Sequence, residues 1–312
     1  MEQRTMRALR FDEYGGPEVM RFDDDVPVPT PAAGELLIKV AGSGINPVDW
    51  KIRDGSARAA FPATFPQIAS REFSGTVAGL GPGVGDFEIG DEVYGIAPKG
   101  SCAQYIVADA KATGLKPVSM DLPDAAAVPL AGMTAWQCLF DVAKLDSGQK
   151  VLIHAAAGGV GTFAVQFAKW KGAYVYGTAS KENLHLLEEL GVDCPIDYHA
   201  TKFEDVAKDV DVVLESIGGD QMFRSLACLK TGGILVSITA APPAEEAVRQ
   251  GKRAVHHMMQ PSREDLEQIA HLIQDLKVRP VISAVVRFDE AIEAFKESQG
   301  GHTRGKLVVR VS

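Results

Sequence analysis

The glycine-rich stretch Ala155–Gly161 has residue types and spacing that suit phosphate binding. The apolar run Val151–Ile153 precedes it, and apolar residues at helical spacing follow it. A strand that runs into such a turn and then a helix can bind a pyrophosphate, because the helix N-terminus offers free N–H groups. The pattern predicts a dinucleotide site, with a tight bend that binds nothing as the alternative, since Ala156 stands at the first glycine position. The residues assigned to the site are Ala157, Gly158, Gly159, Val160 and Gly161.

The residues after the next apolar run indicate which dinucleotide binds. An NAD site places a carboxylate at the end of the second strand, about 20 residues after the glycine-rich turn, to accept a hydrogen bond from the adenine ribose. Here the run Ala173–Thr178 is followed by Ala179, Ser180 and Lys181. A hydroxyl and an ammonium attract a 2'-phosphate, so we predict NADPH, bound by Ser180, Lys181 and Asn183. The alternative is that Ser180 caps a helix and Lys181 is a solvated charge.

Two oppositely charged residues flank Trp50 near the front of the chain. On an extended segment, Asp49 and Lys51 would point the same way, as residues i and i+2 do. Such an ion pair can polarise or protonate a carbonyl oxygen, and we predict that both residues are catalytic. The alternative is a solvent-exposed salt bridge, which contributes little.

The positions of these motifs predict two kinds of fold. Up to about Lys116 the chain is rich in Gly and Pro and carries short β-like runs such as Leu36–Val40, which predicts an irregular β domain. From about Asp121, apolar strands alternate with amphipathic helices, which predicts an α/β domain with a parallel sheet. The strands predicted there are Lys150–His154, Ala173–Thr178, Asp211–Glu215 and Gly233–Ile238. His154, at the end of the first, is expected to be a buried structural histidine.

After Pro280, the sequence again has the residue pattern that is typical of β-strands. A helix is predicted over Ser262–Leu276, with Ser262 as its N-cap, and another over Asp289–Ser298. The final predicted strand is Lys306–Val311. We expect this tail to fold back onto the first domain.

Composition and charge argue against several classes of partner. The formal net charge is −9 and no basic block is present, which disfavours nucleic acid and anionic membrane surfaces. No apolar run approaches the roughly 20 residues that span a bilayer, and Met1–Arg10 has no apolar leader. The four cysteines form no CxxC pair, so neither a zinc lobe nor a disulfide framework is predicted. These features favour a cytoplasmic protein.

Several stretches resemble motifs of the medium-chain dehydrogenases/reductases, namely Ala155–Gly161, Gly177–Ser180 and Gly44–Lys51. Together with Gly301–Lys306, they are most similar to the zinc-independent quinone oxidoreductases, the zeta-crystallin-like branch. The resemblance covers nearly the whole chain. It implies a GroES-like catalytic domain made of residues 1–121 and 279–312, a Rossmann NADPH-binding domain over residues 122–278, and a cleft where nicotinamide meets the substrate.

The resemblance also implies roles for residues near the front of the chain. Asn46 stands where zinc-dependent relatives have their first metal ligand, and Arg71, before Glu72, stands where they have a histidine. A zinc site needs three or four nitrogen or sulfur ligands, so no metal is expected. Asn46 is predicted to hydrogen-bond the nicotinamide ribose or the acceptor oxygen, with a turn before Pro47 as the alternative.

Further positions are interpreted through the same resemblance. Thr134 and Tyr198 match positions that approach the cofactor in relatives, with a mid-helix threonine and a packed aromatic as the alternatives. Relatives that reduce quinones often carry a tyrosine at the position of Lys51, so quinone specificity does not transfer simply. Arg304 and Lys306 are expected to be exposed basic residues beside the last strand and are left out of the site.

These observations predict an enzyme that passes a hydride from NADPH to a quinone or an α,β-unsaturated carbonyl, without zinc. Hydride transfer mainly needs positioning, exclusion of water and support for a developing oxyanion. The alternative is a nucleotide-binding sensor, structural or interaction protein with little turnover. The half-apolar segment Arg253–Met259 is predicted to be the edge strand of the sheet, which favours a homodimer.

Overall fold

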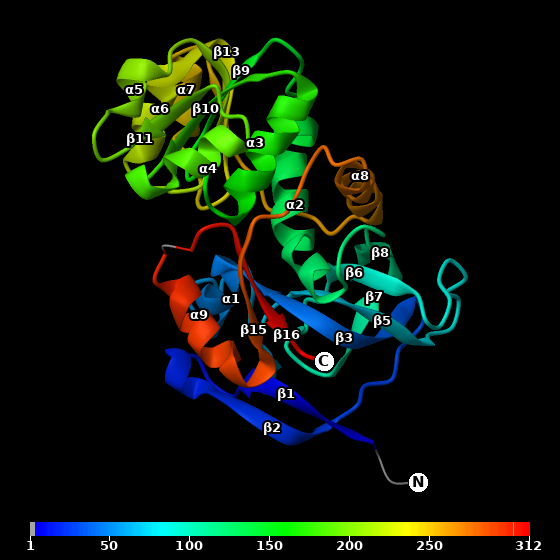
Figure 1. Cartoon of the computed structure of the whole chain (residues 1–312). Helices are drawn as coiled ribbons and strands as arrows, with labels where there is room; N and C mark the ends of the chain where they lie inside the picture. The colour runs from blue at the N-terminus through cyan, green and yellow to red at the C-terminus, as the bar shows by residue number, and fades with distance from the viewer. Residues whose placement is uncertain (1–3, 302) are drawn as a thin grey trace. The chain divides into compact units, whose positions relative to one another are not determined.

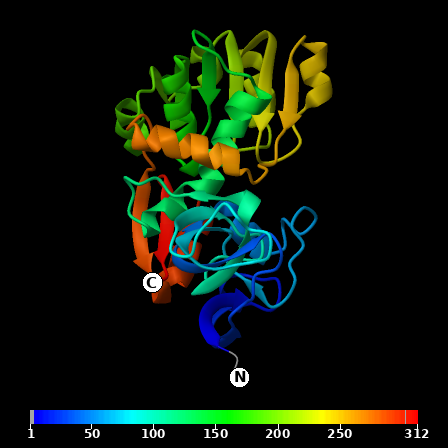
Figure 2. The same ribbon diagram turned by 90° about the vertical axis from the view of Figure 1, so that its right-hand side faces the viewer.

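The structure is a computed structural model that describes residues 4–301 and 303–312. The chain divides into two compact units (Figures 1 and 2). The first consists of the residues up to Leu130, Pro261–Leu276 and Pro280–Ser312, and the second of Ala131–Gln260 and Lys277–Arg279. The domain limits at residues 121 and 278 remain a prediction, whereas these compact units group Pro261–Leu276 with the first unit.

The first unit is built mainly of strands. One seven-stranded sheet has the order β15-β16-β3-β5-β6-β8, with β7 paired to β3, and a three-stranded sheet has the order β2-β1-β4. The tail returns to this unit as expected, because β16 runs antiparallel to β3. The strands are β1 (Thr5–Phe11), β2 (Met20–Pro27), β3 (Glu35–Ile45), β4 (Gln67–Ile68), β5 (Glu72–Leu80), β6 (Glu92–Ile96), β7 (Tyr105–Asp109), β8 (Thr113–Leu115), β15 (Ile282–Arg287) and β16 (Lys306–Arg310).

The core of the first unit lies along β3 and β5. Alternate residues of β3, Leu36, Ile38 and Val40, are fully buried, as the two-residue period of a strand with one core face predicts. Phe73 and Val77 of β5 pack into the same core. This core fixes the ends of both strands, where the polar residues of the front segment lie.

Helices complete the first unit at α1 (Pro47–Arg53), α8 (Arg263–Gln274) and α9 (Ala291–Gln299). Ser262 is the N-cap of α8, as predicted, and its Oγ accepts a hydrogen bond from the Asp265 N–H at 3.1 Å. The Tyr94 hydroxyl of β6 donates to the Leu266 carbonyl at 2.5 Å, which ties α8 to the sheet. Short 3-10 turns lie at η1 (Pro17–Val19), η2 (Ala110–Ala112), η3 (Pro123–Ala127) and η6 (Phe288–Glu290).

The second unit is a Rossmann-type α/β fold with a six-stranded sheet in the order β11-β10-β9-β12-β13-β14. The strand pairs are all parallel, and counted along the chain the order is 3-2-1-4-5-6. The four predicted strands are confirmed with small shifts at their ends. The strands are β9 (Lys150–Ile153), β10 (Tyr174–Ala179), β11 (Cys194–Asp197), β12 (Val210–Glu215), β13 (Leu229–Ser237) and β14 (Arg253–His256).

Helices connect these parallel strands, as a parallel sheet requires. The element η4 is a π-helical continuation of α2, and η5 is a 3-10 turn before α4. The helical elements are α2 (Pro129–Trp136), η4 (Gln137–Val142), α3 (Gly159–Lys171), η5 (Lys181–Asn183), α4 (Leu184–Glu189), α5 (Phe203–Val206), α6 (Gln221–Cys228) and α7 (Ala244–Arg249).

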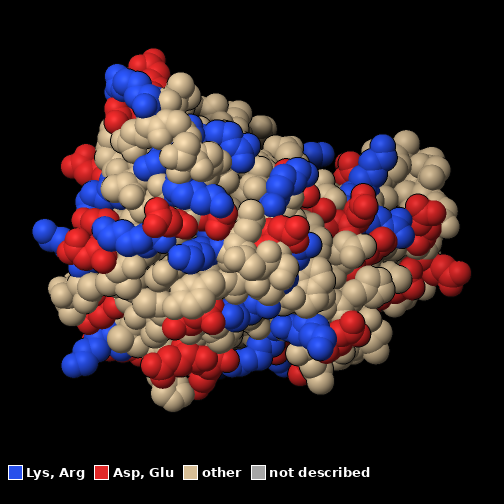
Figure 3. All heavy atoms as spheres, turned by 90° about the horizontal axis from the view of Figure 1, so that it is seen from above, with Lys and Arg blue, Asp and Glu red and all other residues tan. Residues whose placement is uncertain are grey.

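The described residues contain no helix that is both long and apolar enough to cross a membrane. Figure 3 shows one face of the molecule, on which basic and acidic residues are interspersed. No large area of a single charge covers that face.

The turn between β9 and α3 requires glycine at one position in particular. A Cβ on Gly161 would lie 2.2 Å from the Ala155 carbonyl oxygen and 2.7 Å from the Ala156 Cα. Both neighbours are backbone atoms, so they cannot move aside without shifting the turn. Gly161 therefore lets the first turn of α3 pack closely against the end of β9.

We expect Gly161→Ala to destabilise the protein by about 1–3 kcal/mol, because the methyl group overpacks this contact. Urea unfolding followed by circular dichroism measures the loss. Gly85→Ala is the matched control, because a Cβ there meets no atom within 4 Å and Gly85 is exposed. Equal stabilities of the two variants would contradict the packing role of Gly161.

Candidate active site

The glycine-rich turn lies where the parallel sheet of the second unit places a ligand. Gly158 is the N-cap of α3, and Gly158, Gly159 and Val160 are partly exposed while Gly161 is buried. The N–H groups of the first turn of a helix have no partner within the helix, and they carry partial positive charge. This arrangement, at the carboxyl end of the central strand β9, can bind a phosphate group.

The second group of predicted cofactor residues lies at the ends of the neighbouring strands β10 and β11. The N–H of Tyr198 donates to the Ala179 carbonyl at 3.2 Å, so Tyr198 lies beside the end of β10. The Asn183 amide donates to the Ser180 hydroxyl at 3.1 Å. The turn itself is tied to β10, because the Ala156 N–H donates to the Thr178 carbonyl at 2.9 Å. The structure therefore brings Ser180, Asn183 and Tyr198 near the glycine-rich turn.

Lys181 is exposed at the start of η5, directly after Ser180. Within the described ranges, no carboxylate forms an ion pair with Lys181. Ser180 begins η5 but makes no capping bond with its side chain. The neighbouring Glu182 is fully exposed, and hydrogen bonds from its own N–H and from the Ser180 hydroxyl hold its pKa below the usual range. The ammonium of Lys181 is thus the available positive charge at this strand end, and the Glu182 carboxylate beside it is exposed as well.

Two other predicted residues of the second unit are buried. Thr134 lies in α2 and is 6% exposed, and its contact with the cofactor remains a prediction. His154 is 1% exposed, and its ring nitrogens hydrogen-bond Thr178 at 3.2 Å and Ser225 at 2.9 Å. Burial, and then the charge of Arg224, lower the His154 pKa to about 3. The expectation of a buried structural histidine is confirmed.

The front segment is helical, which corrects the expectation of an extended strand there. Asn46 is the N-cap of α1 and Pro47 its first residue, and the Asn46 N–H donates to Asp49 Oδ2 at 2.7 Å. Successive residues of a helix are about 100° apart, so Asp49 and Lys51 point to opposite sides of α1. Both residues are described and they form no ion pair. The pairing that we predicted from an i, i+2 strand spacing is therefore wrong.

Asp49 and Lys51 consequently lie in different environments. Asp49 is 5% exposed. Lys51 is partly exposed, and its ammonium lies 5.4 Å from the centroid of the Trp50 ring, a cation–π contact. A catalytic part for Lys51 remains a prediction, and it would have to work without Asp49.

Asn46 belongs to a buried polar cluster with Glu72 and Lys306. The Asn46 amide donates to Glu72 Oε1 at 2.7 Å, and the Lys306 ammonium donates to the Asn46 carboxamide oxygen. The ammonium also pairs with Glu72 Oε1 at 2.5 Å and donates to the Ile45 carbonyl at 2.9 Å. Glu72 Oε2 accepts from the Leu130 N–H at 2.7 Å. Every charged member of the cluster thus has several partners.

The topology of the sheet explains why these distant residues meet. Asn46 follows the end of β3, Glu72 is the first residue of β5, and Lys306 is the first residue of β16. In the sheet β3 lies between β16 and β5, with Leu307 opposite Ile45 and Glu72 opposite Gly44. Side chains from three neighbouring strand ends therefore converge on one point.

The cluster corrects a second expectation and adds residues that the motifs did not assign. Lys306, which we expected to be exposed, has a side chain only 2% exposed, and Glu72 is fully buried. The sequence offers only a weak signal, since Lys306 begins the apolar run Leu307–Val309 and Glu72 stands before Phe73 in a stretch that also holds Ser, Gly and Thr. Two opposite charges that start buried strands need each other, because an unpaired buried charge is strongly unfavourable.

Asp49 lies near this cluster but takes no part in the ion pair. Burial, and to a smaller degree the Glu72 carboxylate, raise the Asp49 pKa to about 7, against a backbone hydrogen bond and the charges of Lys306 and Arg71 that lower it. Its Oδ1 is buried and has no hydrogen-bond partner among the residues that the structure describes. Asp49 is thus a carboxyl group that can hold a proton near neutral pH.

Comparison with known proteins agrees with this geometry along the whole chain. Residues 32–124 match the alcohol dehydrogenase GroES-like domain, and residues 190–309 match a family described as zinc-binding dehydrogenase. The chloroplast envelope quinone oxidoreductase homolog of Arabidopsis thaliana is 34% identical, with 99% of each chain covered. The chain belongs to the medium-chain dehydrogenase/reductase superfamily. The resemblance of the motifs to this superfamily is confirmed.

Two further members of the superfamily are similar over nearly the full length of the chain. The NADPH-dependent alkenal/one oxidoreductase of the Arabidopsis thaliana chloroplast is 33% identical, covering 98% of this chain and 80% of its own. The solved structure of the quinone oxidoreductase from Coxiella burnetii is 36% identical with a TM-score of 0.93, covering 99% of this chain and 100% of that one. The match confirms the predicted pairing of a GroES-like domain with a Rossmann-type sheet.

We expect Lys306→Met to lower the free energy of unfolding by about 3–5 kcal/mol, because it leaves the Glu72 carboxylate buried without a counter-charge. Urea unfolding measures the change. Lys296→Met is the matched control, since Lys296 pairs with Glu293 at the surface and its loss should cost about 1 kcal/mol or less. Adding Glu72→Gln to Lys306→Met should recover part of the loss. If the free energy of unfolding of Lys306→Met were no lower than that of Lys296→Met, the stabilising role of the buried pair would be contradicted.

We expect Asp49→Asn to change how stability depends on pH. The folded-state pKa of about 7 lies above the ordinary value of 3.8, so the stabilising contribution is complete below about pH 4 and is lost as the pH rises through 7. The charged or titratable groups around Asp49 are Glu72, Lys306, Arg71 and the Cys102 thiol, and they remain in the variant. The difference between the two proteins in urea unfolding from pH 4 to 8 therefore isolates Asp49, and parallel curves would refute the assignment.

Proposed function

We propose that the chain reduces a quinone or an α,β-unsaturated carbonyl with a hydride from NADPH, without zinc. One observation carries this proposal. The glycine-rich turn and Lys181 lie at adjacent strand ends of a 3-2-1-4-5-6 sheet, and β10 ends at Ala179 without a carboxylate, the first one, Glu182, following three residues later. Relatives named as a quinone oxidoreductase and as an NADPH-dependent alkenal/one oxidoreductase support the choice of acceptor.

The residues of the second unit fit a phosphorylated dinucleotide. The partly exposed N-terminus of α3 suits the pyrophosphate, and Lys181 with Ser180 suits a 2'-phosphate. When bound, NADPH supplies a hydride, and the chain has to hold the two reactants, exclude water and deliver a proton. Ser180, Lys181, Asn183 and Tyr198 are proposed to hold the adenosine end, and Thr134 is proposed to contact the nicotinamide.

The residues around Asn46 do not fit a catalytic zinc ion. In the described ranges, no three His, Cys, Asp or Glu side chains gather closely enough to hold a metal. The Lys306 ammonium also stands against both Asn46 and Glu72, and a second cation there would be repelled. We therefore assign no step to a metal, although one of the matched family descriptions speaks of zinc.

The proposed catalytic residues are Asn46, Asp49 and Lys51, each with a different task. Asn46 is held by Lys306 and Glu72, and its amide keeps one N–H for another partner. Asp49 can hold and release a proton near neutral pH. Lys51 offers an ammonium that rests on Trp50. None of these tasks needs the ion pair that the helix prevents.

Assembly and location are also proposals. In the described part of the sheet, β14 pairs with β13 on one side and lies at the end of the strand order, with partly exposed residues along it. An edge of this kind favours two-fold pairing, which supports a homodimer. The composition supports a cytoplasmic location, whereas the Arabidopsis relatives are named for the chloroplast.

We expect the purified protein to oxidise NADPH in the presence of a panel of quinones and enones, and to prefer NADPH over NADH. Lys181→Ala should weaken the binding of NADPH about 10-fold and leave the binding of NADH nearly unchanged, because only NADPH carries the 2'-phosphate. Absorbance of the reduced cofactor measures both effects.

Lys208→Ala is the control for this experiment, since Lys208 is an exposed lysine of the same unit. Ser180→Asp should disfavour NADPH further, because it restores the carboxylate of an NAD site. Equal affinities of the unmodified protein for the two cofactors would remove the 2'-phosphate assignment. Binding of NADPH without oxidation by any acceptor would favour a nucleotide sensor instead of an enzyme.

A further inference from the structure

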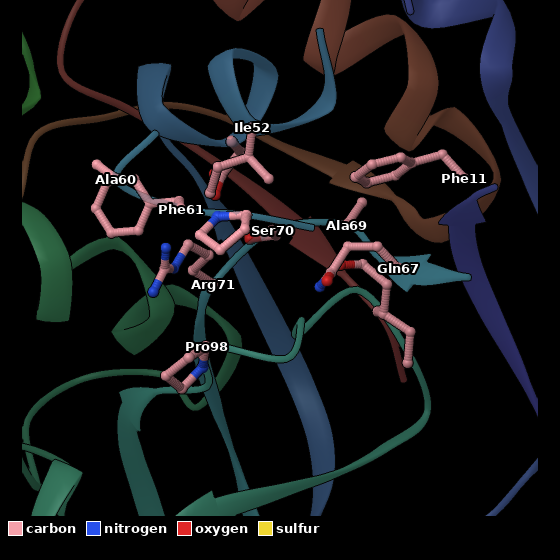
Figure 4. A pocket seen from close by; sticks show the side chains of 12 residues that line it. Phe11, Ile52, Ala60, Phe61, Gln67, Ala69, Ser70, Arg71 and Pro98 are labelled. Atoms are coloured by element: carbon pink, nitrogen blue, oxygen red, sulfur yellow. The ribbon is translucent and has the colours of Figure 1, made fainter. Parts of the chain in front are cut away.

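A pocket of about 200 Å³ lies in the first unit beside α1. Most of the residues that line it are apolar, and two charged residues, Asp49 and Arg71, also line it. Figure 4 shows Phe61 and Arg71 together at one end and Phe11 at the other. A concave, mostly apolar site with a few polar groups is the usual form of a small-molecule site.

In the part of the chain that the structure describes, the Arg71 guanidinium forms no direct ion pair, although it feels the charge of Asp49. Its Cζ lies 4.5 Å from the centroid of the Phe61 ring, which forms a cation–π contact. Among the described residues, the side chain makes neither an ion pair nor a hydrogen bond, and burial lowers the Arg71 pKa. A guanidinium has five N–H donors in a planar fork that matches an oxygen carrying negative charge. The donors of Arg71 are therefore available to a ligand in the pocket.

Asp49 presents the complementary group. Asp49 lines the pocket. Its Oδ2 accepts the Asn46 N–H, while its Oδ1 is buried and has no hydrogen-bond partner within residues 4–301 and 303–312. The other buried carboxylate nearby, Glu72, already has the Lys306 ammonium. A buried carboxyl group without a direct counter-charge can keep a proton at neutral pH and offer it to a ligand.

We infer that this pocket receives the oxygen end of the acceptor, with Arg71 holding the oxygen and Asp49 delivering the proton. The inference rests on the proposed function. It gives a role to Arg71, for which the sequence indicated only that it stands where zinc-dependent relatives have a metal ligand. Phe61 adds a flat apolar wall on which a planar enone or quinone can stack.

The chemistry balances for an enone. A hydride from the dinucleotide forms a C–H bond at the β carbon. The π pair of the C=C bond then forms the new double bond between the α carbon and the carbonyl carbon, and the π pair of the C=O bond moves onto oxygen, which gives an enolate. The N–H donors of Arg71 stabilise that negative charge. The O–H bond of Asp49 then breaks, and its proton forms the C–H bond at the α carbon. The remaining carboxylate takes a new proton from water. For a quinone the proton goes to oxygen.

A binding experiment tests the pocket without turnover. 4-Nitrophenolate mimics an enolate, and its absorbance shifts when its charge is bound. We expect the unmodified protein to bind it, and Arg71→Gln to weaken binding about 10- to 100-fold. Arg58→Gln is the matched control, because Arg58 is exposed in the same unit. Arg71→Lys keeps the positive charge and should lose less of the nitrophenolate affinity than Arg71→Gln. Thermal unfolding of each variant checks that it is folded.

A kinetic experiment tests the proton donor. Asp49→Asn keeps a hydrogen-bond donor, so nitrophenolate binding should change less than about twofold. The kcat for an enone should fall about 10²-fold or more, because the amide cannot release a proton. In the unmodified protein kcat should decline as the pH rises above 7, and the variant should lose that decline.

The outcomes separate this inference from the proposed function. Enone reduction that is unaffected by Arg71→Gln and Asp49→Asn, with unchanged nitrophenolate binding, overturns the pocket and leaves the reductase intact. Arg71-dependent nitrophenolate binding by a protein that reduces no acceptor overturns the reductase and supports the oxygen-binding pocket. Nitrophenolate binding that is equal in Arg71→Gln and Arg58→Gln overturns the pocket whatever the activity.

Discussion

An ammonium and a carboxylate that have both been taken out of water hold three strand ends of the first unit together. Lys306 and Glu72 cannot separate without leaving a charge in an apolar interior, which costs several kcal/mol. Their shared contact fixes the end of β3, from which Asn46 starts α1. The direction of α1 then decides that Asp49 enters the interior while Lys51 does not. The front segment thus depends on one ion pair for its geometry.

The same pair also bears on the protonation of Asp49, whose pKa is raised first of all by burial. One buried ammonium serves two nearby carboxyl groups, and Glu72 takes it with a direct contact. Asp49 has a single backbone hydrogen bond and the more distant charge of Arg71, which is too little to offset burial. The pKa of Asp49 consequently rises while Arg71 keeps its donors. Burial of a carboxyl group without a direct counter-charge is therefore the main physical origin of a proton-holding group in this unit.

What could be predicted from the sequence follows from how local each feature is. The glycine-rich turn was predictable, because strand, turn and helix are contiguous and Gly161 is required by backbone atoms only a few residues away. Helix α1 was predictable in principle, since Asn46, Pro47 and Asp49 stand at N-cap, N1 and N3. The expectation that Asp49 and Lys51 lie on an extended segment did not take this capping pattern into account. The burial of Lys306 was not predictable from spacing, because its partner lies 234 residues away and only the sheet order joins them.

The place of β16 in the sheet has a consequence for how the protein is made. Glu72 leaves the ribosome 234 residues before Lys306, which at cellular synthesis rates is roughly 10 to 50 seconds. The segment Ala131–Gln260 of the second unit is synthesised in between, and it can form its sheet while the first unit still lacks β15 and β16. During that interval the end of β3, Gly42–Ile45, lacks the strand that pairs with it, and Glu72 lacks the Lys306 ammonium. The first unit therefore cannot complete its seven-stranded sheet until Lys306–Arg310 have been synthesised, long after its other strands.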